Sequence, residues 1–287
     1  MYGWAWDITS KELFKNLPGN YAGTILSAGD FLSTNPNVDS FDVVLAYAPL
    51  HPRVSIRLNP ENTIVGVAGW EELDGKSIWD SLNRFRYFGA CNSKIANRIN
   101  NTLLYKTVWV LSHGVDTELF KPSPEKPTRF TVGWAGNHTR TMKRFTLAKE
   151  AAHGMEFKVA GLVGTPEYKR RSDMPKWYSG LSCLLVTSTS EAHSLVTYEA
   201  MSSGVPVVTT ITGDVDENIV DGVNGFLYPV VCSVNQITQI LTKLRDNPTL
   251  RDKVGAEARR TVLNRWTWGE IVKPYINAFN EVVENRT

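Results

Sequence analysis

Short apolar runs alternate along the chain with segments of helical period. In the first half, the apolar runs have the length and composition of buried strands. They are residues 41–48, 63–68 and 107–111. Between the last two runs, Ile78, Leu82 and Phe85 recur at the spacing of one helix face. Strands that alternate with helices are typical of α/β domains built on parallel sheets.

The second half repeats this alternation over more elements. The predicted strands are residues 130–133, 157–160, 181–186 and 205–209. The predicted helices are residues 143–153, 194–203, 237–244 and 271–283. Gly154 and Gly204 directly follow two of these helices, at positions where glycine ends a helix without strain.

A proline-rich segment separates the two halves. Residues 121–127 (KPSPEKP) hold three prolines and otherwise only polar side chains, a composition typical of linkers. We therefore predict two Rossmann-like, doubly wound α/β domains, over residues 1–122 and 128–267. Ligands of such sheets bind at the carboxyl ends of the strands, beside helix N-termini.

Composition and charge narrow the class of protein. Hydrophobic residues make up 42% and charged residues 21% of the 287 positions, which excludes a disordered or fibrous chain. The formal net charge is only +2, whereas a general nucleic-acid binder carries a clear basic excess. We expect no nucleic-acid partner.

The cysteines and the apolar runs bear on location. Cys91, Cys183 and Cys232 are far apart and form no C-x-x-C pair, which argues against a disulfide framework or a zinc ribbon and favours a reducing compartment. The first residues lack the pattern of a signal peptide, and no apolar run approaches the roughly 18 residues of a membrane span. We expect a cytoplasmic location, either free or at the inner face of a membrane.

The most informative stretch is residues 188–210, a polar loop between a buried strand and a helix that starts near Ser194. The backbone amides of Ser194, Leu195 and Val196 lie at the start of this helix, where free N–H groups and the helix dipole favour an anion such as phosphate. Glu191 lies in the loop and Glu199 inside the helix. We expect these two carboxylates to make different hydroxyl contacts.

The residues of this stretch resemble those of the retaining, nucleotide-sugar-dependent glycosyltransferases of family four, which have the GT-B fold. Glu191 and Glu199 form the family's E-x7-E pattern, and residues 199–208 (EAMSSGVPVV) match its continuation. The resemblance extends over residues 107–287. It implies two domains that face across a cleft, the first of them trimmed, and a C-terminal helix, residues 268–287, that crosses back onto the first domain.

The resemblance implies roles for the residues of this loop and helix. The second glutamate, Glu199, would hold the ribose hydroxyls of the donor, and Glu191 would face the donor sugar. The remaining donor-binding positions of the stretch are His193, Ser194, Leu195 and Val196. Because no cluster of metal-ligating residues surrounds the histidines of the site loops, we predict no metal and no cofactor.

A second group of candidate residues opens the second domain. Residues 132–137 (VGWAGN) are similar to the family's glycine-rich turn, in which Gly136 and Asn137 would approach the diphosphate. Arg140 and Lys143 follow near the place of the family's basic pair. Fixed cations there would stabilise the charge that grows on the leaving diphosphate. With Glu191, these two residues are the predicted catalytic set.

The resemblance therefore implies a metal-independent transfer of a sugar, with retention, from a UDP- or GDP-linked donor to a hydroxyl of a glycan or lipid-linked acceptor. One alternative is a nucleotide-sugar or glycan-binding protein of the same fold without activity. Another is a glycosidase, which needs two carboxyls about 5 to 9.5 Å apart at one bond.

Weaker signals lie outside these motifs. Residues 169–171 (KRR) form a basic run that we expect to be a solvated loop. The family's first-domain histidine is missing, and His51 or Glu71 are candidates for its place. A basic and aromatic stretch suits either an ordinary surface or a peripheral contact with an anionic membrane. Its residues are Arg84, Phe85, Arg86, Tyr87, Phe88, Lys94, Arg98 and Lys106.

Overall fold

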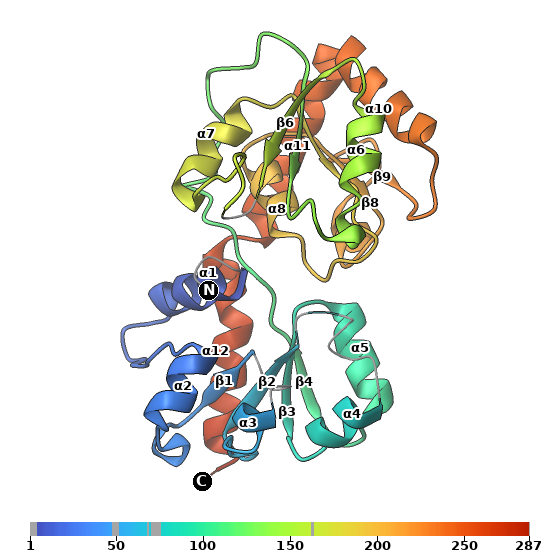
Figure 1. The fold of residues 1–287 in the computed structure, drawn as a ribbon. Coiled ribbons are helices and arrows are strands. Elements are labelled where there is room, and N and C mark those ends of the chain that lie inside the picture. Colours follow the sequence, from blue (N-terminus) through green and yellow to red (C-terminus); the bar gives the residue numbers. More distant parts are fainter. Residues whose placement is uncertain (1–4, 48–51, 68, 70–75, 162–163, 287) are drawn as a thin grey trace. The chain divides into compact units, whose positions relative to one another are not determined.

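The computed structural model describes residues 5–47, 52–67, 69, 76–161 and 164–286 (Figure 1). The chain divides into two compact units, each with its own parallel sheet. The first unit combines residues 1–114 with residues 268–287, and the second is the continuous stretch 115–267. The predicted class, α/β with two parallel sheets, is confirmed.

The described residues of the first unit form a four-stranded parallel sheet in the order β1-β2-β3-β4. Its strands are β1 (Val44–Ala46), β2 (Thr63–Val67), β3 (Tyr87–Ala90) and β4 (Thr107–Val110). The connecting elements are α1 (Ala5–Asn16), α2 (Ala28–Thr34), η1 (Val38–Ser40), α3 (Pro52–Ser55), α4 (Lys76–Leu82) and α5 (Ser93–Thr102). The C-terminal helix α12 (Trp268–Glu284) completes this unit.

Helix α12 is held to this sheet by its buried face. The hydroxyl of Tyr275 donates to the carbonyls of Leu111 and Ser112, at 3.2 and 3.0 Å, directly after β4. The indole of Trp268 lies against Gly114, where a side chain would not fit. The tail of the chain is therefore part of the core of the first unit, although the whole second unit separates it from the rest in sequence.

The described residues of the second unit form a five-stranded parallel sheet in the order β6-β5-β7-β8-β9. Its strands are β5 (Thr131–Ala135), β6 (Glu156–Ala160), β7 (Cys183–Val186), β8 (Val207–Thr210) and β9 (Phe226–Tyr228). Its helices are η3 (Thr141–Lys143), α6 (Phe145–Ala151), η4 (Arg171–Asp173), α7 (Met174–Ser179), α8 (Leu195–Ser202), α9 (Val215–Asn218), α10 (Val234–Asp246) and α11 (Pro248–Arg265).

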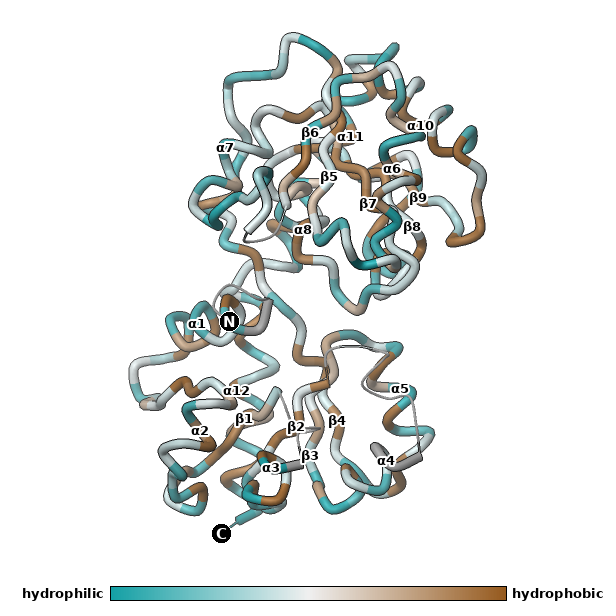
Figure 2. Tube along the Cα trace, viewed as in Figure 1, coloured by the Kyte–Doolittle hydropathy of each residue, from teal (hydrophilic) through white to brown (hydrophobic). Residues whose placement is uncertain are grey.

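Local sequence explains where these elements begin and what they bury. Helix α10 starts with a capping box in which Ser233 and Gln236 satisfy each other's backbone amides. Its fully buried stripe, Ile237, Leu241 and Leu244, packs against the strands of the second sheet. Hydrophobic positions lie mainly along the strands of both units, and connecting loops are largely hydrophilic (Figure 2). Burial of these apolar rows is the main stabilising contribution to each sheet.

The first boundary between the units lies ahead of the predicted linker. The amide of Val115 donates to the carbonyl of Trp266 at 2.7 Å, and Phe120 is fully buried against Tyr178, with ring centroids 5.9 Å apart. Residues 115–122, which the sequence placed in the first domain, therefore pack in the second. Proline content marks a stretch without regular structure, but it does not show which core the neighbouring apolar residues join.

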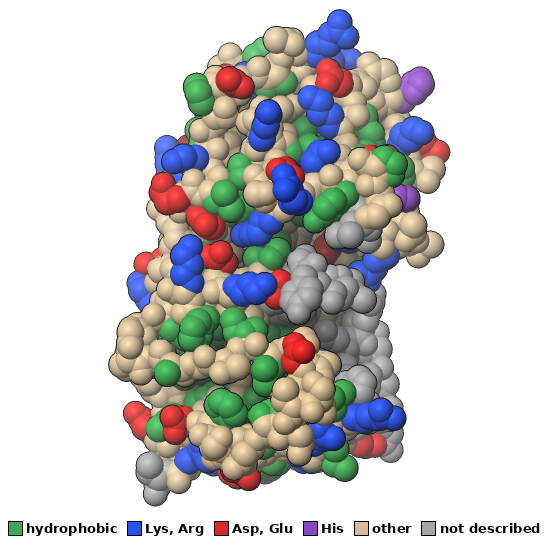
Figure 3. Space-filling model, turned by 60° about the vertical axis from the view of Figure 1, so that its left-hand side comes forward, with side chains coloured by type: hydrophobic (Ala, Val, Ile, Leu, Met, Phe, Trp, Pro, Cys, Tyr) green, Lys and Arg blue, Asp and Glu red, His purple; other side chains and the backbone are tan. Residues whose placement is uncertain are grey.

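The basic and aromatic stretch of the first unit does not form an aromatic surface. Phe85, Tyr87 and Phe88 are buried in the core, and none of the three is more than 1% exposed. The side chains of this stretch that reach solvent are therefore the basic ones. On the face that Figure 3 shows, Lys and Arg side chains are interspersed with Asp and Glu. The part of the membrane prediction that relied on exposed aromatic rings is therefore wrong.

Candidate functional site

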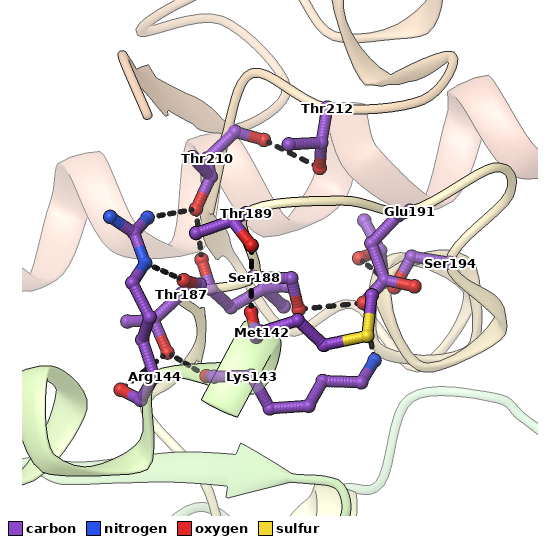
Figure 4. Close-up of polar contacts among 12 residues, drawn as sticks. Met142, Lys143, Arg144, Thr187, Ser188, Thr189, Glu191, Ser194, Thr210 and Thr212 are labelled. Atoms are coloured by element: carbon purple, nitrogen blue, oxygen red, sulfur yellow. Dashed lines mark hydrogen bonds and ion pairs between the residues drawn. The ribbon is translucent and has the colours of Figure 1, made fainter. Parts of the chain in front are cut away.

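The predicted site residues gather at the carboxyl edge of the second sheet. All strands of this sheet are parallel, so the loops that follow β5, β7 and β8 leave from the same edge. The loop after β5 carries Gly136, Arg140 and Lys143, and the loop after β7 carries Glu191. Figure 4 shows that residues of both loops point toward one another.

Lys143 and Glu191 form the central contact between these loops. The ammonium group of Lys143 makes an ion pair with Oε1 of Glu191, and the same oxygen accepts a hydrogen bond from the hydroxyl of Ser188 at 2.6 Å. The two charged side chains are 19% and 15% exposed. An ion pair at this depth is less screened than a surface pair, yet it stays within reach of a ligand.

The backbone of the two loops is also connected. The hydroxyl of Thr187 donates to the carbonyl of Lys143 at 2.7 Å and accepts from the indole nitrogen of Trp134 at 3.2 Å. The amide of Thr189 donates to the carbonyl of Met142 at 2.8 Å. The hydroxyl of Thr189 donates to the same carbonyl at 3.4 Å (Figure 4). These bonds fix the position of the Lys143 backbone relative to the loop that carries Glu191.

Arg144, directly after Lys143, has a structural role that the sequence did not indicate. Its guanidinium donates to the carbonyls of Thr187 and Val230, at 2.5 and 2.6 Å, and to the hydroxyl of Thr210 at 3.4 Å. Its backbone is left-handed, with φ of 46°. The predicted helix 143–153 is therefore split here into η3 and α6, because a left-handed residue cannot continue a helix.

The turn after β5 brings the backbone close to the edge of the sheet. Gly136 has φ of 154°, and a Cβ there would lie 3.3 Å from the ring of Trp134. The side chain of Asn137 accepts from the amide and the hydroxyl of Thr139, at 2.9 and 2.7 Å. Asn137 thus stabilises the turn with its side chain, and Arg140, whose carbonyl accepts from the amide of Lys143, is half-buried at the end of it.

The N-terminus of α8 provides the amides that the sequence predicted. The side chain of Ser194 caps none of them. Among the described residues, none accepts a hydrogen bond from the amides of Leu195 and Val196. Two donors at the positive end of a helix dipole form a suitable site for an anionic group.

Glu199 lies one helical turn further along, and it is 5% exposed. Its Oε1 accepts from the guanidinium of Arg171 at 2.6 Å, and its Oε2 accepts from the hydroxyl of Tyr178 at 3.1 Å. Burial raises the pKa of this carboxyl, and the charge of Arg171 and these two hydrogen bonds offset part of that effect. A buried carboxyl whose pKa is shifted by burial and by a charged partner is characteristic of functional sites.

His193 differs from the prediction. Its side chain is fully buried and stacks on Tyr198, with ring centroids 4.3 Å apart, while Trp266 lies on it at 4.9 Å. Its Nδ1 is 2.7 Å from a carboxylate oxygen of Asp214, which belongs to the loop after β8. The imidazole is therefore not placed to touch a donor, because core residues surround it, and it connects the loops after β7 and β8.

Arg171 and Tyr178 are the site residues that sequence reasoning missed. The basic run 169–171 was expected to be solvated, and Arg170 does form an exposed pair with Asp173. Arg171 instead contacts a buried glutamate 28 positions later in the sequence. No local pattern distinguishes two adjacent arginines whose side chains leave a loop in different directions.

The two glutamates have different partners, Lys143 for Glu191 and Arg171 for Glu199. This arrangement does not favour the glycosidase alternative, which needs both carboxyls at one bond. Within the described ranges there is no group of three or more His, Cys, Asp or Glu residues arranged to hold a metal ion. The candidates His51 and Glu71 lie outside the described residues.

None of the described helices combines the length and the apolar character that crossing a bilayer requires.

Part of the second unit is similar to known glycosyltransferases. Residues 141–261 match the family model of glycosyl transferases group 1. The D-inositol 3-phosphate glycosyltransferase of Kribbella flavida is 33% identical over 194 residues, which are 53% of this chain and 46% of that protein. The match thus spans less than half the length of this curated relative.

Solved structures agree on the fold. A glycosyltransferase from Rickettsia africae has a TM-score of 0.70 at 14% identity, covering 99% of this chain and 84% of that one. HepE from Anabaena, in a crystal structure with UDP and glucose, has a TM-score of 0.70 at 16% identity over 90% of this chain and 84% of that one. The two parallel α/β units share the fold of these glycosyltransferases, and residues 141–261, which match the family model, include Lys143, Glu191 and Glu199.

Proposed function

We propose that this protein transfers a sugar from a nucleoside-diphosphate sugar to an acceptor hydroxyl, with retention at the anomeric carbon and without an essential metal. The observation that carries the proposal is the row of groups at the carboxyl edge of the second sheet. The loops after β5 and β7 carry Lys143 and Glu191, and helix α8, which follows the second of these loops, carries the amides of Leu195 and Val196 and the carboxylate of Glu199. Each group has a charge or donor suited to one part of such a sugar nucleotide.

Each group has a part in binding the donor. The Glu199 carboxylate accepts from the ribose hydroxyls, because carboxylate oxygens are strong acceptors for such a pair. The amides of Leu195 and Val196 and the cations of Arg140 and Lys143 bind the diphosphate. Glu191 faces the hydroxyls of the sugar. The complex of HepE with UDP and glucose supports a donor of this class for the fold.

The reaction breaks the bond between the anomeric carbon and the diphosphate oxygen and forms a bond from that carbon to the acceptor oxygen on the same face. The acceptor proton goes to an oxygen of the departing phosphate, so that the atoms and charges balance. Negative charge increases on the diphosphate as its bond breaks. Cations and amides held in place beforehand therefore stabilise the transition state more than the bound donor.

The ion pair between Lys143 and Glu191 is the donor-free arrangement of the same machinery. When the diphosphate and sugar enter, Lys143 gains an anionic partner and Glu191 gains hydroxyl donors. Each group thus exchanges one partner for another, and donor binding leaves no buried charge unpaired. The acceptor that we propose is a hydroxyl of a glycan or of a lipid-linked sugar.

A thermal-shift panel tests the proposal. Purified protein is heated with UDP-, GDP- and ADP-sugars and with the matching free nucleotides. A donor at 100 times its Kd stabilises the native state by about 2.7 kcal/mol and raises Tm accordingly. The best donor is then incubated with sugar acceptors, and products are followed by mass spectrometry. Binding without transfer or donor hydrolysis supports the inactive binding protein; no shift with any nucleotide overturns the proposal.

A further inference from the structure

Among the described residues, the Glu199 carboxylate has two hydrogen-bond partners, and both come from the segment between β6 and β7. Arg171, the first residue of η4, donates to Oε1 at 2.6 Å, and Tyr178, in α7, donates to Oε2 at 3.1 Å. Each oxygen thus has one donor of its own. The arrangement differs from a bidentate pair, in which one guanidinium occupies both oxygens.

These partners are held in place by a fully buried aromatic residue. The guanidinium of Arg171 lies 5.0 Å from the centre of the Phe120 ring, and the ring of Tyr178 makes a T-shaped contact with the same ring. Tyr178 is fully buried, and its hydroxyl also lies 3.3 Å from the carbonyl of Val196 in the first turn of α8. The carboxylate, its two donors and the amide end of α8 are therefore one packed unit.

The number of acceptor positions that remain is informative. A carboxylate has about four lone-pair sites, two on each oxygen. Arg171 occupies one site on Oε1 and Tyr178 one on Oε2, so each oxygen keeps one. The side chain of Glu199 is 7% exposed, so the carboxylate is nearly but not completely covered. Two acceptor positions on neighbouring oxygens match two neighbouring hydroxyl donors.

We propose that Arg171 and Tyr178 are positioning residues that keep the Glu199 carboxylate ionised and oriented, with one acceptor site on each oxygen directed to a vicinal diol. That the diol is the ribose of a nucleotide rests on the proposed function. The two residues touch the carboxylate rather than the ligand. They set the discrimination between a ribonucleotide and its 2′-deoxy counterpart, because a site built for two hydroxyls rejects a ligand that lacks one.

The proposal makes the site sensitive to pH in a defined direction. The groups that act on the pKa of Glu199 are Arg171 from η4 and Tyr178 from α7. In α11, which packs on α8, the guanidinium of Arg259 donates instead to the carbonyls of Phe120 and Ser202. Burial already raises the pKa of Glu199, and loss of Arg171 raises it further. Diol binding needs the ionised carboxylate. As the pH falls, a variant without Arg171 therefore becomes protonated at Glu199, and loses binding, at a higher pH than the wild type does.

The test compares Arg171→Gln with Arg170→Gln, which removes the neighbouring, exposed arginine that pairs with Asp173. Calorimetry measures the affinities for UDP and 2′-deoxy-UDP, and for GDP and 2′-deoxy-GDP, from pH 5 to pH 8. We expect Arg171→Gln to weaken ribonucleotide binding about tenfold and to reduce the preference over the deoxynucleotide. Arg170→Gln should match the wild type, Arg171→Lys should restore part of the affinity, and Tyr178→Phe should lower the preference without changing the fold.

Two results separate this proposal from the proposed function. In the first, the wild type binds a nucleotide tightly, and Arg171→Gln shows the same preference for the ribonucleotide over the deoxynucleotide and the same pH midpoint of binding. This result overturns the positioning role and leaves the proposed function intact. Tighter binding by Arg171→Gln also overturns it, because Arg171 would then compete with the ribose. If no nucleotide binds to the wild type, the proposed function fails, and carbon-13 NMR of the Glu199 carboxyl judges the positioning role alone. A titration midpoint that does not rise in Arg171→Gln overturns it.

Discussion

Lys143 and Glu191 are 48 positions apart and belong to different loops, and their side chains form an ion pair at the carboxyl edge of the second sheet. Thr187 and Thr189 fix the two loops to each other by bonds to the backbone of Lys143 and Met142. The cation is therefore held at a defined place before any ligand arrives. Such preorganisation is what electrostatic catalysis requires.

Replacing Lys143 by alanine removes the cation that we assign to the leaving diphosphate. We expect kcat to fall on the order of 100-fold, about 3 kcal/mol, with a smaller change in KM, because the charge matters most in the transition state. Arg140→Ala should act in the same direction. Steady-state kinetics with the donor found by thermal shift measures both, and unchanged turnover in the two variants would remove the diphosphate role.

A matched control for Lys143→Ala is Lys149→Ala, at an exposed position in α6 of the same segment. It removes the same charge from the second unit without touching Glu191. We expect turnover within about twofold of the wild type, since an exposed charge at this distance is screened by salt. An equal loss in both variants would point to a general effect of net charge.

The Glu199→Gln variant should separate stability from function. Burial raises the pKa of Glu199 in the folded state. This carboxyl therefore contributes to the free energy of unfolding below its unfolded pKa of about 4.3, where it is protonated in both states. That contribution is lost as the pH rises through the folded pKa. Denaturation of both proteins from pH 4 to pH 8 should show Glu199→Gln gaining stability relative to the wild type as the pH rises. Nucleotide affinity should fall about tenfold or more; a pH-independent difference contradicts the raised pKa.

Gly213 is expected to tolerate no side chain. Its φ is 60°, and a Cβ there would lie 2.5 Å from the carbonyl oxygen of Ala192 and 2.9 Å from that of Glu191. Gly213→Ala should cost about 2 kcal/mol or more, because backbone strain adds to displacement of the loop that carries Glu191. Gly154→Ala is the control, with φ of 79° and nothing within 4 Å. It should cost only about 1 kcal/mol, and equal losses in urea denaturation would refute the close contact.

Arg144 is expected to matter for folding rather than for ligand binding. Its guanidinium satisfies the carbonyls of Thr187 and Val230, so Arg144→Ala should destabilise the second unit by about 2–4 kcal/mol. Arg260, which is 65% exposed and pairs only with Glu257 in the described structure, is the comparison. Its alanine variant should change stability by less than about 0.5 kcal/mol. Similar denaturation midpoints for the two variants would contradict this role.

The sequence predicted the strands well where both faces are covered. The runs 63–68 and 181–186 became β2 and β7, because continuous apolar stretches of this length fit parallel strands. The run 41–48 yielded only the three-residue β1, whose residues are half-buried at the edge of the first sheet. Strand β9 was not among the predicted strands, since its three residues are too few to show a period.

The sequence predicts the two glutamates of the site, but it does not predict the donors that hydrogen-bond to Glu199. The loop–helix corner with Glu191 and Glu199 follows from a strand, a polar loop and a helix in succession. The donors that control the charge of Glu199 come from another loop, and the choice of Arg171 over Arg170 depends on where each side chain leaves the backbone. Burial of His193 likewise depends on Trp266, 73 positions later (266 − 193), and no local pattern indicates that contact.

The bridge between Val115 and Thr267 has a consequence for engineering. The ends of residues 115–267 are neighbours, joined also by the bond from Val115 to Trp266. This stretch is therefore an insertion with adjacent entry and exit points, and a single short peptide would close its ends. Because we propose that the donor binds to this stretch, it is the segment to exchange between relatives when donor preference is to be altered.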